Sequence, residues 1–268
     1  MKTGLVFLKL KKEKGYLKKM KGKIILITGA SSGIGKATAE LLGDGKNKLI
    51  ICGRRKDRLE KLSSQINGEV HILNFDVRDK KSVFDSISSI PDKLKNIDVL
   101  INNAGNAHGM HFSHEADLDD WDAMIDSNVK GLMYVTKALL PIMTKRNQGQ
   151  IINMGSIAGF EVYPKGNVYC ASKFAVDAFT KGLRIDLNKF NIRVCAIHPG
   201  LVETEFSMVR FKGDVQKSKK VYKDIIPLNP FDVANAINYM INVPLRVTIS
   251  DLTILATDQA NATIINRK

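Results

Sequence analysis

Cysteine is scarce in this chain, which has only Cys52, Cys170 and Cys195 among its 268 residues. The odd number and irregular spacing match neither a disulfide framework nor a metal or redox motif. We therefore expect reduced core thiols in a cytoplasmic protein. Apolar runs are also short, and none approaches the ~20 residues that span a bilayer. The composition, with 44% apolar and 25% charged residues, indicates a soluble globular protein with a sizeable core.

Acidic residues are almost missing from the N-terminus, where residues 1–23 hold nine lysines against Glu13 alone. The whole chain has a net charge of +14, so the remainder is only mildly basic. A basic segment can bind nucleic acid or an acidic membrane surface. We favour a solvated, disordered extension over residues 1–22 and expect neither partner. The stretch LVFLKL resembles no secretory signal, and the sequence leaves open whether residues 1–19 precede a start at Met20.

The rest of the chain alternates short apolar runs with helical patterns. The expected strands are 23–28, 48–52, 70–75, 98–102, 150–154 and 192–197. The expected helices are about 33–43, 55–66, 79–90, 118–145 and 165–190. Nearly unbroken Ile, Leu and Val in the strands is typical of parallel strands buried on both faces. The pattern predicts one α/β domain over residues 23–268, with a doubly wound parallel sheet flanked by helices.

One segment, residues 203–230, breaks this rhythm because it is long, charged and poorly periodic. Long connections in compact domains are usually functional or disordered, and we expect this one to cover a substrate. A helix over 231–241 and a last strand within 249–257 should follow it.

The stretch TGASSGIG (28–35) joins the first expected strand to the first helix. Gly29 permits a tight turn, while Gly33 and Gly35 let backbone amides approach a pyrophosphate at the helix N-terminus. A glycine pattern at this junction predicts a dinucleotide site. From this stretch, the expected cofactor contacts are Gly29, Ser31, Ser32, Gly33, Ile34 and Gly35.

The second strand ends in CGRR (52–55), without the acid that would accept the ribose hydroxyls of NAD. Arg54 and Arg55 stand there instead, and the guanidinium group matches phosphate oxygens. This predicts NADP as the cofactor. Asp76 and Val77 follow the third strand, and Asn103, Ala104 and Gly105 follow the fourth; we expect all five to contact the cofactor.

Three residues suggest proton transfer. Ser156 follows the fifth strand, while Tyr169 and Lys173 share one face of the next helix. A free tyrosine has a pKa of ~10, and a neighbouring ammonium should lower it. Ser156 can hydrogen-bond a carbonyl oxygen. Together they predict a site that interconverts an alcohol and a ketone.

These motifs, with SNVKG (127–131) and HPGLVET (198–204), occur in an order that resembles the short-chain dehydrogenase/reductase family over about residues 23–257. The resemblance implies a Rossmann fold and a catalytic set of Asn128, Ser156, Tyr169 and Lys173. In that family, the asparagine holds a water in a proton relay, and the tyrosine and lysine also contact the cofactor. The family usually forms tetramers through two long helices, here about 118–145 and 165–190. It further implies cofactor contacts by Pro199, Gly200, Val202 and Thr204.

The stretch PGLVETEFSMVRFKGD (199–214) resembles a branch of that family, the NADP-dependent 3-hydroxy acid dehydrogenases, also described as serine or L-allo-threonine dehydrogenases. The resemblance implies small hydroxy acids, or their semialdehyde or keto forms, as substrates. An acidic substrate needs a cation, for which Arg210 is our candidate alongside Ser156 and Tyr169.

Two alternatives stay open: a carbonyl or 3-oxoacyl reductase of the same family, and a binding protein that uses the fold as a nucleotide sensor. The run HGMHFSH (108–114) spaces three histidines at every third position. We expect a loop near the pocket rim there and no metal site. His198 ends a strand, and we expect it to be a packed residue.

Overall fold

The computed structural model describes residues 22–268. The expected N-terminal extension over residues 1–22 therefore lies, apart from Gly22, outside the described residues. None of the helices within residues 22–268 is long and apolar enough to cross a bilayer.

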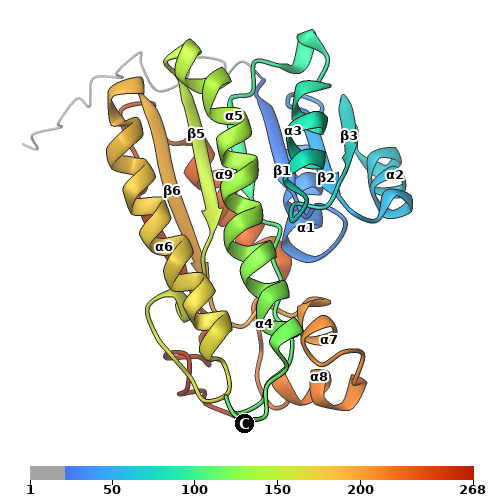
Figure 1. The fold of residues 1–268 in the computed structure, drawn as a ribbon, viewed down its shortest axis with the longest axis vertical. Coiled ribbons are helices and arrows are strands. Elements are labelled where there is room, and N and C mark those ends of the chain that lie inside the picture. The colour runs from blue at the N-terminus through green and yellow to red at the C-terminus, as the bar shows by residue number, and fades with distance from the viewer. Residues whose placement is uncertain (1–21) are drawn as a thin grey trace, which may run out of the picture.

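Seven parallel strands form one sheet in the order β3-β2-β1-β4-β5-β6-β7 (Figure 1). The strands are β1 (Ile24–Thr28), β2 (Lys48–Gly53), β3 (Val70–Asn74), β4 (Val99–Asn102), β5 (Gly149–Met154), β6 (Ile192–Pro199) and β7 (Asp251–Ile254). The chain runs outward from β1 to β3 and then returns to place β4 on the other side of β1. This reversal leaves a crevice at the carboxyl ends of β1 and β4.

Helices cover both faces of the sheet, because each strand buries alternate residues on opposite sides. Ile25 and Ile27 pack in one hydrophobic cluster, while Leu26 packs in the other. The first cluster includes residues of α1 (Gly33–Leu42), α2 (Lys56–Gln65) and α9 (Pro230–Asn242). The second includes residues of α3 (Lys80–Ser88), α5 (Leu132–Arg146) and α6 (Asn167–Leu187), of which α5 and α6 lie in front of the sheet in Figure 1. The predicted doubly wound single domain is confirmed.

The helix expected over 118–145 is divided into α4 (Leu118–Ile125), a π-helical stretch (Asp126–Gly131) and α5. A π turn is a local distortion that recurs at functional sites. Here it carries the buried side chain of Asn128. Short 3-10 helices add single turns at Asp92–Leu94, Ile157–Gly159 and Asn188–Phe190.

The segment 203–230 is more regular than expected, because it contains α7 (Phe206–Arg210) and α8 (Val215–Val221). Its base is closed by two backbone hydrogen bonds of Leu228, with Glu203 and Leu201, each 2.9 Å long. Asp214 caps α8 by accepting a hydrogen bond from the Lys217 N–H. In Figure 1, both helices lie beyond the carboxyl ends of the strands, over the crevice side of the sheet. The expected last strand is β7.

Candidate active site

A cleft of about 460 Å³ opens at the carboxyl ends of the strands, bordered by the turns after β1 and β4. Of the residues predicted for the site, only Gly35 and Asn128 do not line it. Its lining includes Gly29, Ser31, Ser32, Gly33, Ile34, Arg54, Arg55, Asp76, Val77, Asn103, Ala104, Gly105, Ser156, Tyr169, Lys173, Pro199, Gly200, Val202, Thr204 and Arg210. The sequence motifs therefore meet in one place.

The glycine turn after β1 is tied to the turn after β4. The Asn103 side-chain amide donates to the carbonyl oxygens of Thr28 and Gly29, at 2.9 and 3.2 Å. Gly29 has a φ of +66°, which glycine adopts without strain. A Cβ on Gly35 would lie 2.4 Å from Asn103 Nδ2. Gly35 thus permits close packing of the two turns and, unlike its neighbours, does not face the cleft.

The first turn of α1 faces the cleft without an acidic residue of its own. Ser32 stands at the N-cap but, within residues 22–268, its side chain makes no capping hydrogen bond. The N–H groups at this helix start are therefore oriented for an anion such as a pyrophosphate.

Arg55 crosses over the glycine turn. Its Nη2 donates to Ser31 Oγ at 3.0 Å and to Ser32 Oγ at 2.7 Å. Arg54 lies beside Asp76, with 3.7 Å between Nη1 and the carboxylate oxygen. Burial raises the pKa of Asp76, but hydrogen bonds from Arg78 and the charge of Arg54 outweigh it and hold that pKa below its usual value.

Ser156 and the Tyr169–Lys173 pair meet across the cleft. Ser156 follows β5 and its hydroxyl accepts a hydrogen bond from the Ala158 N–H at 3.1 Å. Tyr169 and Lys173 are one turn apart in α6, and Lys173 Nζ donates to the Met154 carbonyl oxygen at 2.8 Å. The Lys173 side chain is buried, and burial lowers its pKa to about 8.

Arg210, at the end of α7, places its guanidinium between two tyrosine rings. Its Cζ lies 5.3 Å from the ring centroid of Tyr163 and 5.5 Å from that of Tyr169. Nη2 donates to the Tyr163 hydroxyl at 2.8 Å, whereas Nε is buried without a hydrogen-bond partner. No acid among the described residues forms an ion pair with Arg210. The cleft therefore holds an uncompensated cation beside Tyr169.

The geometry agrees with what comparison to known proteins finds. A family model described as short chain dehydrogenase matches residues 23–214. This chain belongs to the short-chain dehydrogenase family. The predicted family resemblance is thus confirmed.

Relatives and solved structures of this family match nearly the whole chain. The NADP-dependent 3-hydroxy acid dehydrogenase of Schizosaccharomyces pombe is 44% identical over 257 residues, covering 94% of this chain and 99% of the relative. NADP-dependent 3-hydroxy acid dehydrogenase YdfG of Shigella flexneri is 43% identical over 240 residues, covering 89% and 97%. A structure titled as the closed form of serine dehydrogenase complexed with NADP+ is 42% identical, has a TM-score of 0.85, and is matched over 91% of this chain and 99% of that chain. Serine dehydrogenase from Escherichia coli is 37% identical with a TM-score of 0.77, over 88% and 99%.

One expectation about this dehydrogenase is wrong. We expected Lys173 to lower the pKa of Tyr169, but the pKa of Tyr169 is raised because burial disfavours the phenolate and Tyr163 adds to the effect. A hydrogen bond with Ser156 and the charge of Arg210 oppose that rise without outweighing it. Lys173 Nζ lies 5.9 Å from the Tyr169 ring centroid and is engaged with the backbone. Ser156 and Arg210 are thus the chain's own groups that favour the phenolate.

The side chain of Asn128 lies behind the cleft. It accepts from the Asn106 N–H at 2.8 Å and from Ser127 Oγ at 3.1 Å. It donates to the Asn106 carbonyl oxygen at 2.8 Å and to Ser172 Oγ at 3.0 Å. These four hydrogen bonds occupy both donors and both acceptor positions of the side-chain amide. A water held by Asn128 would therefore have to bond to its main chain.

Sequence reasoning missed Arg58 and Glu205. Arg58 Nη1 donates to both carboxylate oxygens of Glu205, at 2.7 and 2.9 Å, and Arg55 Nη1 donates at 3.0 Å. Burial raises the pKa of Glu205, but these arginines outweigh it and hold that pKa below its usual value. The ion pairs attach the segment 203–230 to the turn that follows β2. No sequence signal could pair positions so far apart.

Proposed function

We propose that this protein is an NADP-dependent oxidoreductase that interconverts a small 3-hydroxy acid and its keto or semialdehyde form. Serine, L-allo-threonine and 3-hydroxypropionate represent the substrate class. The observation that carries the substrate class is the guanidinium of Arg210, which lines the cleft beside Tyr169 without an acidic partner among the described residues. The names of the similar dehydrogenases point to the same class.

The residues that border the cleft fit NADP. The close packing of Gly29 and Gly35 against the turn after β4 leaves backbone amides exposed to a pyrophosphate. Arg54 and Arg55 provide guanidinium groups for the 2′-phosphate. Thr204 lies close to the glycine turn, because its side chain is 3.4 Å from where a Cβ on Gly33 would stand. When bound, NADP supplies the acceptor or donor of the hydride.

The chain's own residues would then orient the substrate and move its proton. Ser156 Oγ hydrogen-bonds the substrate oxygen and holds it near the Tyr169 hydroxyl. Tyr169 takes the hydroxyl proton during oxidation and returns it during reduction. Lys173 contributes a buried amine whose pKa of about 8 lets it exchange protons near neutrality. Asn128 braces the end of this site through its bonds to Asn106 and Ser172.

Arg210 orients an acidic substrate by its carboxylate. Its side chain lines the cleft and forms no ion pair with an acid of residues 22–268, so a substrate carboxylate in the cleft can bind the guanidinium and neutralise the charge. The guanidinium lies close to the rings of Tyr163 and Tyr169, so the distance from the substrate carboxylate to its hydroxyl becomes a criterion of selection.

The two alternatives have less support. A carbonyl or 3-oxoacyl reductase would share the proton-transfer residues, but nothing in those reactions requires an uncompensated cation beside Tyr169. A nucleotide-sensing protein would need neither Ser156 nor Lys173 in reacting positions.

We also propose that the enzyme is a homotetramer in the cytoplasm. Leu118 of α4, together with Phe174 and Ile185 of α6, exposes apolar side chains on the helices through which the family assembles. The three cysteines are buried free thiols, which suits a reducing compartment. Light scattering after size-exclusion chromatography would test the tetramer, and a dimeric mass would contradict it.

The test of the function is the initial rate at which purified protein forms the reduced cofactor, NADPH or NADH. NADP+ and NAD+ would be offered separately with L-serine, L-allo-threonine, 3-hydroxypropionate, 3-hydroxybutyrate and a neutral secondary alcohol. We expect turnover of a hydroxy acid with NADP+, reduced roughly 100-fold or more by Tyr169→Phe. Activity on the neutral alcohol alone would retain the mechanism and reject the substrate class.

A further inference from the structure

His198 lies directly behind the catalytic serine. It belongs to β6, and its side chain is only 2% exposed, as the expectation of a packed residue requires. The ring contacts Phe160 edge-on, with 5.3 Å between the ring centroids. Packing alone, however, does not account for the two ring nitrogens, because a buried polar atom needs a hydrogen-bond partner.

The Nδ1 atom faces the backbone of Ser156. It lies 3.4 Å from the Ser156 carbonyl oxygen, which also accepts a 2.8 Å hydrogen bond from the Gly159 N–H. A Cβ on Gly155 would stand 2.5 Å from the same Nδ1. Glycine at position 155 therefore allows the ring to approach the peptide that carries the serine. The Gly159 N–H and the His198 ring thus both contact this carbonyl oxygen.

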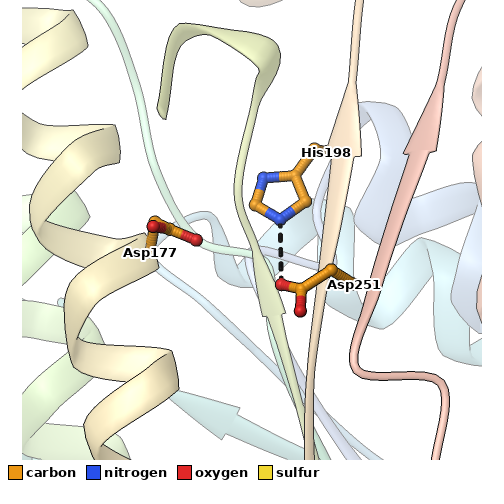
Figure 2. Close-up of side chains that lie close together, drawn as sticks. All are labelled: Asp177, His198 and Asp251. Carbon is orange, nitrogen blue, oxygen red and sulfur yellow. Dashed lines mark hydrogen bonds and ion pairs between the residues drawn. The ribbon is translucent and has the colours of Figure 1, made fainter. Parts of the chain in front are cut away.

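The Nε2 atom faces Asp251 of β7, 3.4 Å from Oδ1 (Figure 2). Asp177 of α6 lies on the same side of the ring, and ligand atoms of Asp177, His198 and Asp251 lie within 4.8 Å of one another. That spacing would suit a metal ion. Each carboxylate is already paired with a side-chain cation, however: Lys181 lies 2.6 Å from Asp177, and Arg184 lies 3.1 Å from Asp251.

We propose that His198 is a positioning residue that connects Asp251 to the backbone of Ser156 and so holds the serine hydroxyl in place for proton transfer by Tyr169. Both ring nitrogens face oxygen acceptors, so the protonated ring can donate to both. A ring with a single proton can donate to only one of these two oxygens.

The inference rests on the proposed function for its reaction, and a matched pair of variants tests it. In His198→Asn the amide nitrogen stands close to the position of Nδ1, whereas in His198→Gln it reaches toward the position of Nε2. We expect His198→Asn to keep kcat within about threefold. His198→Gln should lower kcat roughly tenfold through the lost positioning bond, with the KM for NADP+ nearly unchanged.

Controls separate this role from folding and from the function itself. His114→Gln removes an exposed histidine and should match the wild type in kcat and melting temperature. If His198→Gln does not fold, Asp251→Asn retains the ring but removes the carboxylate that faces Nε2, and it should lower kcat with the KM for NADP+ nearly unchanged. A wild type inactive on hydroxy acids would reject the substrate class, and the variants would then be compared on the neutral alcohol.

Two results would overturn the proposal. Equal kcat values for His198→Asn and His198→Gln would mean that the ring only fills space. A loss of wild-type activity in EDTA that Zn²⁺ or Mg²⁺ restores would make the cluster a cation site instead.

Discussion

Replacing Arg210 by methionine removes a charge while retaining an unbranched side chain of similar length. In the structure, the guanidinium has one hydrogen bond, to Tyr163, and a buried Nε–H without a partner among the described residues. A carboxylate that accepts from this group would form a charge-assisted hydrogen bond worth about 1.5–3 kcal/mol. At 1.4 kcal/mol for each factor of ten, kcat/KM for a 3-hydroxy acid should fall roughly 10- to 150-fold. A neutral alcohol cannot form that bond and loses only the effect of Arg210 on the Tyr169 hydroxyl, so its kcat/KM should fall less than that of the acid.

The assay is the ratio of kcat/KM for 3-hydroxypropionate to that for a neutral secondary alcohol, with NADP+ saturating. Lys217→Met is the matched control, because it removes a charge from the exposed part of the same segment and should leave the ratio unchanged. Arg210→Lys retains the charge without the planar donor geometry and should give an intermediate ratio. Equal losses on both substrates in Arg210→Met would refute the reasoning and show that the guanidinium supports Tyr169 or the fold.

Three further predictions concern the cofactor end and the buried lysine. Arg55→Ala should raise the KM for NADP+ roughly 10- to 150-fold while changing that for NAD+ far less; similar increases for both cofactors would contradict a 2′-phosphate contact. Glu205→Gln should lower the KM for NADP+, because the arginines would no longer share their charge with a carboxylate. The decrease should be up to about fivefold, since exposed ion pairs are worth ~0.2–1 kcal/mol. No change relative to NAD+ would count against this competition. The pKa of Lys173 is lowered to about 8 in the folded protein from 10.5, so the unfolded state binds more protons between those values and stability rises with pH there. Relative to Lys173→Met, urea titration should show the wild type gaining about 2 kcal/mol from pH 7.5 to 9.5; a constant difference would mean that the lysine titrates alike in both states.

The fold was predictable because its strands carry a strong local signal. Apolar runs such as 23–28 and 192–197 have the length and the Ile and Val content of strands that are buried on both faces. Helix boundaries agreed within a few residues wherever a cap or a glycine marked them. The interruption between α4 and α5 was not predictable, because a π turn changes no residue pattern that periodicity could detect. The helices within residues 203–230 were missed because they are too short to repeat a pattern.

The predicted site depended on residues close together in sequence. Tyr169 and Lys173 are one helical turn apart, and the glycine turn lies between a strand and a helix, so local geometry determines their positions. The raised pKa of Tyr169 shows the limit of that reasoning. A pairwise rule predicts the effect of a neighbouring ammonium, but burial depends on every element packed around the phenol. Desolvation is a property of the fold that no spacing encodes.

The partners that sequence reasoning missed share a physical reason. Glu205 meets Arg58, and His198 meets Asp251, across strands and segments that only the completed sheet brings together. Each of these contacts joins residues far apart in the sequence, and each acts on a motif residue through a neighbour. Glu205 acts on Arg55 at the cofactor end, and His198 acts on Ser156 at the chemical end. The motifs therefore specify which atoms react, whereas these long-range contacts decide how firmly the reacting atoms are held. Variants that keep every motif and alter only such contacts are the ones that would separate the two contributions.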